Sequence, residues 1–140
     1  MNARGAKVRS MPYIAARDVP AASDWYQRLL GCVSDMDPTH PHRREYDRVV
    51  SDGDIVLQFH SWDEEGHEFM PSLAAPDSAM HGHGVVLEFL VEDFDEAVQR
   101  ARSLSAELLG EDTFPNGTRA FSLRDLDGYV VVLAGRSSAC

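Results

Sequence analysis

The side chains of this 140-residue chain that could do chemistry are a scattered set of histidines and carboxylates. His81-Gly-His83 carries two imidazoles that could serve as metal ligands. Further donors could come from five residues: His60, Glu65, His67, Glu68 and Glu88. We expect these histidines to lie on loops or at a rim instead, because imidazoles flanking a glycine are not preorganised for a metal. Cys32 and Cys140 are the only cysteines, which excludes a disulfide framework and a cysteine-rich zinc site.

Glu88 is the carboxylate that the pattern singles out, because it lies in an otherwise apolar predicted strand. A carboxylate buried without a partner is costly, so it must be paired, hydrogen-bonded or functional. One interpretation pairs it with His60, Arg119 or Arg124 inside the protein. The other has it hold a cationic or hydrogen-bond-donating ligand, which His60 and Gln58 help to orient. The sequence supports both interpretations.

A predicted first helix helps to position these candidate residues. Asp18 is the predicted N-cap, Pro20 lies in the first turn, and Gly31 follows the last turn. The apolar positions recur at the spacing of a buried helical face: Ala22, Trp25, Tyr26 and Leu29. Strands are expected over residues 8–17, 45–51 and 55–61, and Asp52-Gly53 predicts a hairpin turn between the last two.

The second half of the chain repeats this order. Asp93 is an N-cap candidate, and apolar residues follow at helical spacing: Phe94, Ala97, Val98, Ala101 and Leu104. Strands are expected over residues 85–91, 119–123 and 129–133, and Leu109-Gly110 is interpreted as the counterpart of Leu30-Gly31. Asp18 and Asp93 lie 75 positions apart, as do Asp52-Gly53 and Asp127-Gly128. These equal offsets predict two copies of one βαβββ unit.

We therefore expect a single α+β domain over residues 8–133. Its first module covers residues 8–61 and its second covers residues 85–133, with flexible tails at residues 1–7 and 134–140. The connecting segment, residues 62–84, is either a ligand-facing loop or an exposed linker.

The charge and the ends of the chain limit the possible partners and locations. A formal net charge of -10 gives no general attraction to nucleic acid or to an anionic membrane. The acidity serves either solubility or a preference for cationic ligands. No secretory signal and no transmembrane stretch is recognisable, and with two cysteines we expect a cytoplasmic protein.

Three motifs in order resemble those of the vicinal-oxygen-chelate superfamily. They are residues 11–31 with Trp25-Tyr26 and Leu30-Gly31, Val91-Glu-Asp93, and Arg124-Asp-Leu-Asp-Gly-Tyr129. That superfamily holds glyoxalase I, extradiol dioxygenases, fosfomycin-resistance enzymes and bleomycin-resistance proteins. The resemblance covers residues 8–133 and implies two βαβββ modules paired into a curled, cleft-forming mixed sheet. In the enzymes, the cleft holds one divalent metal bound by a His or Glu from each of four strands.

The resemblance places the four metal-ligand positions on Met11, Val86, Val132 and Gln58, or on Leu57 in place of Gln58 by strict repeat offset. Apolar side chains and an amide are poor ligands for Zn²⁺, Mg²⁺, Mn²⁺ or Fe²⁺. We therefore expect no metal and no cofactor, and the pattern is most similar to the metal-free bleomycin-resistance-like branch.

Strand alternation predicts which side chains face the cleft. The candidate ligand-binding residues are Tyr13, Gln58, His60, Trp62, Glu88, Arg119 and Phe121. Arg119 and Phe121 are expected to reach the cleft from the penultimate strand, whereas Leu87, Phe89 and Val91 are expected to pack on the helix. Tyr13, Trp62 and Phe121 could supply stacking or cation–π contacts.

The resemblance and the unsuitable ligand positions favour metal-independent binding or sequestration of a small cationic or aromatic molecule, such as an antibiotic. The resemblance also implies a homodimer whose clefts use both chains. Two alternatives stay open. One is an enzyme, either a divalent-metal-dependent lyase, isomerase or dioxygenase with atypical ligands, or a metal-free catalyst using His60 and Glu88 as an acid–base pair. The other is a regulatory domain without a ligand, whose residues 62–84 make a dimer contact.

Overall fold

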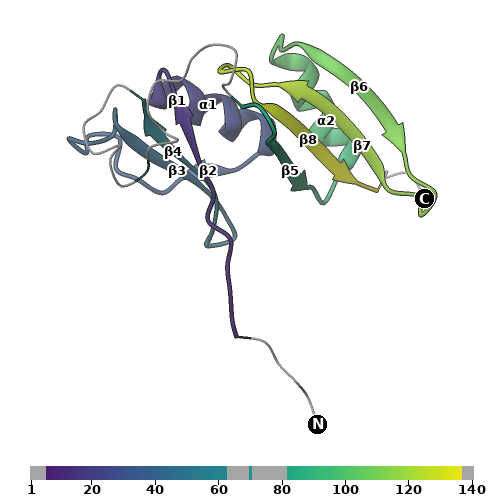
Figure 1. The fold of residues 1–140 in the computed structure, drawn as a ribbon, viewed down its shortest axis with the longest axis horizontal. Coiled ribbons are helices and arrows are strands. Elements are labelled where there is room, and N and C mark those ends of the chain that lie inside the picture. The colour runs from purple at the N-terminus through teal and green to yellow at the C-terminus, as the bar shows by residue number, and fades with distance from the viewer. Residues whose placement is uncertain (1–5, 63–69, 71–81, 137–140) are drawn as a thin grey trace.

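Two four-stranded sheets lie side by side along the long axis of the molecule (Figure 1). The computed structural model describes residues 6–62, 70 and 82–136. The first sheet has the strand order β1 (Tyr13–Ala16), β4 (Asp54–Ser61), β3 (Tyr46–Ser51) and β2 (Val33–Ser34). The second has the order β5 (Val86–Leu90), β8 (Val130–Gly135), β7 (Arg119–Arg124) and β6 (Leu108–Thr113). Within each sheet the first pair is parallel and the others are antiparallel, which confirms the α+β fold of two βαβββ modules.

Helix α1 (Val19–Leu30) begins and ends at the expected residues. The Asp18 carboxylate accepts a hydrogen bond from the backbone N–H of Ala21 at 3.1 Å, and Gly31 ends the helix with φ 67°. The predicted apolar face is buried against the first sheet: Ala22, Trp25, Tyr26 and Leu29. In the described residues, no helix is long and apolar enough to cross a membrane.

Helix α2 (Phe94–Ser103) begins at Asp93 as predicted, with the cap bonded to the N–H of Glu96 at 3.1 Å. It ends earlier than predicted, because the chain leaves it through Ser105 in the left-handed conformation, with φ 55°. Leu109 and Gly110 consequently lie in β6, and their interpretation as a second helix end is wrong. The predicted first strand is also shorter than residues 8–17, since the ladder begins only at Tyr13.

The two modules share one core and several polar links. The Tyr26 ring lies 5.5 Å from that of Phe59 and 6.0 Å from that of Phe89, measured between centroids, so α1 contacts both modules. Its hydroxyl donates to Asp125 in the β7–β8 turn at 2.5 Å. On the other side of the boundary, the Arg100 guanidinium donates to the Leu29 carbonyl at 2.9 Å and so caps α1. These links fix the second module against the first.

Replacing Gly31 by Ala should lower the free energy of unfolding by about 1–2 kcal/mol, because an L side chain is strained at this φ. An added Cβ would also meet the Arg100 guanidinium carbon at 3.3 Å. Gly53 is a matched control, since it has φ 83° but nothing within 4 Å of an added Cβ. Urea denaturation of Gly31→Ala and Gly53→Ala measures the difference. Equal losses of free energy in the two variants would show that the contact between the added Cβ and Arg100 does not contribute to the loss at Gly31.

Candidate functional site

The cavity face of a sheet is defined here as the side that points away from its helix. In the first sheet, strand register aligns Tyr13 with Gln58 and Arg48 on this face, and the next row aligns His60 with Tyr46. Tyr13, Gln58 and His60 are therefore brought together as expected.

Tyr46 and Arg48 also belong to this face, and sequence reasoning missed them. A register shift between Val49 and Val50 changes which residues of β3 lie beside Gln58. A regular two-residue hairpin at Asp52-Gly53 would have placed Asp47 there instead. In the structure Asp47 is fully buried on the opposite face. The signal that could have found Tyr46 is its aromatic character within an alternating strand, combined with an allowance for a bulge.

The amide of Gln58 is held in one orientation. The Tyr46 hydroxyl donates to Gln58 Oε1 at 2.6 Å, and Gln58 Nε2 donates to the Met11 carbonyl at 3.1 Å. Gln58 is only 3% exposed. Burial and the neighbouring Tyr13 raise the pKa of Tyr46, so it stays a neutral donor at ordinary pH. Arg48 forms an ion pair with Asp35, which neutralises its charge at the margin of the face.

His60 and Trp62 continue the cavity face toward the end of β4. His60 Nδ1 lies 2.7 Å from the Ser61 carbonyl, which can only accept, so this nitrogen carries the proton in the neutral ring. The Arg17 guanidinium lies 5.4 Å from the centroid of the Trp62 ring, a cation–π distance. The first sheet thus presents aromatic rings and an imidazole on one surface, with the Gln58 amide buried among them.

Glu88 lies on the cavity face of the second sheet, in a row with Val132 and Ser122. Its side chain is exposed, as are its neighbours Val86 and Leu90, which are 58% and 84% exposed. Within the described part of the chain, no side chain forms an ion pair or hydrogen bond with Glu88. The internal pairings considered for it are therefore absent from those residues.

The expectation that Arg119 and Phe121 reach the cavity face is wrong. Phe121 is 3% exposed in the core, and the Arg102 guanidinium of α2 lies 5.3 Å from its ring centroid. Arg119 lies 4.7 Å from the ring of Phe94 and pairs with Asp95 at 2.9 Å. Both side chains therefore face α2. β7 alternates as predicted, but Arg119 and Phe121 lie on the side of the sheet opposite to the predicted one.

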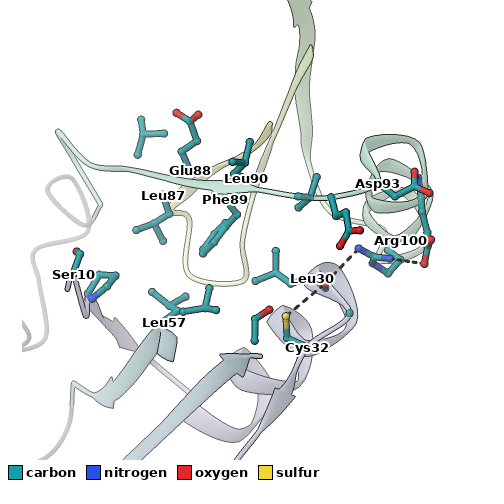
Figure 2. A pocket seen from close by; sticks show the side chains of 18 of the residues that line it. Ser10, Leu30, Cys32, Leu57, Leu87, Glu88, Phe89, Leu90, Asp93 and Arg100 are labelled. Carbon is teal, nitrogen blue, oxygen red and sulfur yellow. Dashed lines mark hydrogen bonds and ion pairs between the residues drawn. The ribbon is translucent and has the colours of Figure 1, made fainter. Parts of the chain in front are cut away.

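A groove of about 1000 Å³ separates β5 from the first module. Its apolar wall includes Leu30 and Leu57 of the first module and Leu87 and Phe89 of β5. Figure 2 shows Leu87 and Phe89 pointing toward the first module, while Glu88 points to the opposite side of β5. The groove therefore lies on the helix side of β5 and meets the cavity face only along the edge of that strand.

A family model described as "Glyoxalase/Bleomycin resistance protein/Dioxygenase superfamily" matches residues 9–133. The chain belongs to this superfamily. The match spans nearly all of the sequence and both modules, and it confirms the resemblance that the three motifs carried. Comparison with curated proteins found no match.

Solved structures of similar fold agree with this membership. TioX from Micromonospora sp. ML1 is 20% identical, with a TM-score of 0.67 over 93% of this chain and 99% of that one. A glyoxalase/bleomycin resistance protein/dioxygenase family enzyme from Burkholderia phytofirmans PsJN is 18% identical, with a TM-score of 0.67 over 90% and 96%. Lactoylglutathione lyase from Agrobacterium tumefaciens is 18% identical, with a TM-score of 0.65 over 94% and 96%. At these identities the likeness shows the fold alone.

The metal-ligand positions that superfamily resemblance assigns to this chain do not fit a divalent metal. Val86 and Val132 have no donor atom, Met11 offers only a thioether, and the Gln58 amide is already bonded to Tyr46 and to the main chain. Within residues 6–62, 70 and 82–136, no group of three or more His, Cys, Asp or Glu side chains could hold a metal ion. Four of the scattered candidate donors lie outside the described residues: Glu65, His67, Glu68 and His81.

Proposed function

We propose that this superfamily member binds a small cationic or aromatic molecule, such as an antibiotic, without a metal ion, and sequesters it. One observation carries the proposal. The positions that would hold a metal are apolar or already bonded, while the second sheet keeps an accessible carboxylate, Glu88, between apolar side chains, and the first sheet presents aromatic rings. Such a surface suits a ligand that needs recognition rather than activation.

The chemistry of the two faces favours a cation with an aromatic or apolar body. Glu88 has no counter-charge among the described residues, so a ligand ammonium or guanidinium would supply one. Tyr13 and Tyr46 lie 6.1 Å apart between ring centroids and offer ring faces for stacking or cation–π contact. Val86 and Leu90 flank the carboxylate with apolar surface.

Isothermal titration with cationic aromatic natural products tests the proposal, with neutral and anionic analogues as comparison ligands. Glu88→Gln should weaken binding of the cationic ligands about tenfold, equivalent to about 1.4 kcal/mol, and leave the neutral analogues unchanged. Asp112→Asn is the matched control, because Asp112 is also an exposed carboxylate but lies on β6, at the far edge of the same sheet. Equal effects of both substitutions would argue against a site at Glu88.

Chelator treatment separates this function from metal-dependent catalysis. Protein dialysed against a chelator should bind the same ligands with unchanged affinity, because no metal contributes to the proposed site. Stoichiometric metal in untagged protein by elemental analysis, with binding lost on its removal, would favour a lyase, isomerase or dioxygenase instead.

We further propose a cytoplasmic homodimer whose clefts use both chains. Apolar side chains exposed on the cavity faces support a covering partner, among them Met11, Val86 and Leu90. The free, half-buried Cys32 is compatible with a reducing compartment. Sedimentation should give twice the mass of the chain, and a monomer that still binds ligand would separate the two proposals.

A further inference from the structure

Within the described residues, the outer edge of strand β5 is unpaired. β5 is the terminal strand of the second sheet, and among those residues it bonds only to β8, on its inner side. The Val91 amide donates to the Ala134 carbonyl at 2.8 Å, and in a parallel ladder alternate residues point the same way. The main-chain groups of Val86, Glu88 and Leu90 therefore point outward. In the described part of the chain, no group bonds to these three amides or carbonyls.

The equivalent edge of the first module is not open in this way. The outward amide of Ala15 in β1 donates to the Tyr129 hydroxyl at 3.2 Å. The next outward amide, that of Arg17, donates to Asp127 at 3.0 Å. Two outward amides at the β1 edge are thus bonded to the second module, whereas their repeat counterparts at Leu90 and Glu92 have no such partner among the described residues. An open edge next to a groove is a template for one further strand.

The side chains along β5 indicate what that strand carries. On one face, Glu88 is an exposed acid without a partner among the described residues, and a second exposed acid, Glu92, lies just beyond the end of β5. On the other face, Leu87 and Phe89 point into the groove (Figure 2). Side chains of paired strands share a face with their opposite neighbours. An added strand with alternating basic and apolar residues would therefore meet the Glu88 carboxylate on one side and the apolar groove on the other.

We propose that the ligand is an extended, cationic, peptide-like molecule that adds to β5 as a fifth strand of the second sheet. This inference rests on the proposed function and specifies its ligand class. The main-chain amides of the ligand bond to Val86, Glu88 and Leu90, its basic side chains lie beside Glu88, and its apolar side chains enter the groove. The groove volume of about 1000 Å³ is at the upper end of the range for small-molecule sites, which suits a short peptide.

Amide hydrogen exchange read by NMR on the full chain tests the proposal. The probe is the blocked hexapeptide Lys-Val-Lys-Val-Lys-Val. Saturating peptide should slow exchange at Val86, Glu88 and Leu90 by about tenfold or more, while Leu87 and Phe89, already bonded to β8, change little. The same peptide N-methylated at alternate residues should bind at least about tenfold more weakly, since it lacks the strand-pairing donors.

Two other outcomes would overturn the strand-addition inference, and both can be told apart from a failure of the proposed binding function. If cationic aromatic molecules bind at Glu88 but the hexapeptide does not, the binding function stands and the strand-addition inference fails. If the three amides are already protected in the free protein, in a manner that depends on protein concentration, a second copy of the chain occupies the edge. Glu88→Gln should weaken the peptide about tenfold, and Asp112→Asn should not.

Discussion

Replacing Asp125 by Ala is expected to lower the free energy of unfolding by about 3–4 kcal/mol. Asp125 is buried in the β7–β8 turn and accepts three hydrogen bonds, from the Tyr26 hydroxyl at 2.5 Å and from the amides of Asp127 and Tyr129 at 2.9 Å each. Burial raises the pKa of this carboxyl, while the three donors act in the opposite direction. Its removal would leave the Tyr26 hydroxyl buried between the two modules without an acceptor.

A double-mutant cycle separates the Tyr26–Asp125 bond from the turn itself. Tyr26→Phe alone should cost about 1–2 kcal/mol, because Asp125 keeps its two turn amides. In the Asp125→Ala background, the same substitution should be neutral or stabilising, since the hydroxyl has already lost its partner. Urea denaturation followed by circular dichroism gives all four free energies. Strictly additive losses would mean that the hydrogen bond between the modules contributes nothing.

The repeat was predictable because its signals are local. Asp18 and Asp93 cap helices in the same way, and Asp52-Gly53 and Asp127-Gly128 both lie in turns between antiparallel strands, although the second turn is longer. Caps and tight turns depend on a few neighbouring residues, so composition and spacing reveal them. The strand order and the two modules followed from these landmarks.

The predictions that proved wrong concern features that depend on pairing and packing between helices and strands. The bulge at Val49 and Val50 shifts one register and brings Tyr46 to the cavity face, which the hairpin turn alone does not indicate. The side of the sheet on which Phe121 lies depends on packing against α2, not on the alternation of β7. The residue ranges of strands β2 and β6 were not predicted. One is short and the other is exposed, so neither buries a full face and neither shows apolar alternation.

In the candidate site, too, the residues set by local strand alternation were predictable, whereas features that depend on packing between the modules were not. Its first-sheet residues Tyr13, Gln58 and His60 were identified by phase relative to a buried strand, and the register places them together. The open edge of β5 could not be inferred, because it depends on which strand of one module covers which edge of the other. The sequence also favoured an internal partner for Glu88 as much as a ligand. In the structure Arg119 pairs with Asp95 and Glu111, and Arg124 pairs with Glu107.

Raising the pH above about 10 is expected to destabilise the protein through two tyrosines at the module boundary. Burial raises the pKa of Tyr129 to about 12, and the charges of Asp125 and Asp127 act in the same direction. Burial also raises the pKa of Tyr26 well above its ordinary value, with Asp125 adding to the effect. In the unfolded chain both phenols ionise near pH 10. Their contribution is therefore fully present below about pH 10 and is lost as the pH rises toward about 12.

For Tyr129, a shift of about two pKa units corresponds to about 3 kcal/mol of stability across this window. Urea denaturation at about pH 8 and about pH 11 should show a steep loss for the wild type and a smaller loss for Tyr129→Phe. Phe121→Leu is the control, because it removes buried aromatic volume without a phenol and should lower stability by about 1 kcal/mol at both pH values. The part of the tyrosinate absorbance that Tyr129→Phe removes should rise together with unfolding rather than before it, since this phenol is buried in the folded protein. A free energy of unfolding that is unchanged at the higher pH would contradict the role of these hydroxyls in holding the two modules together.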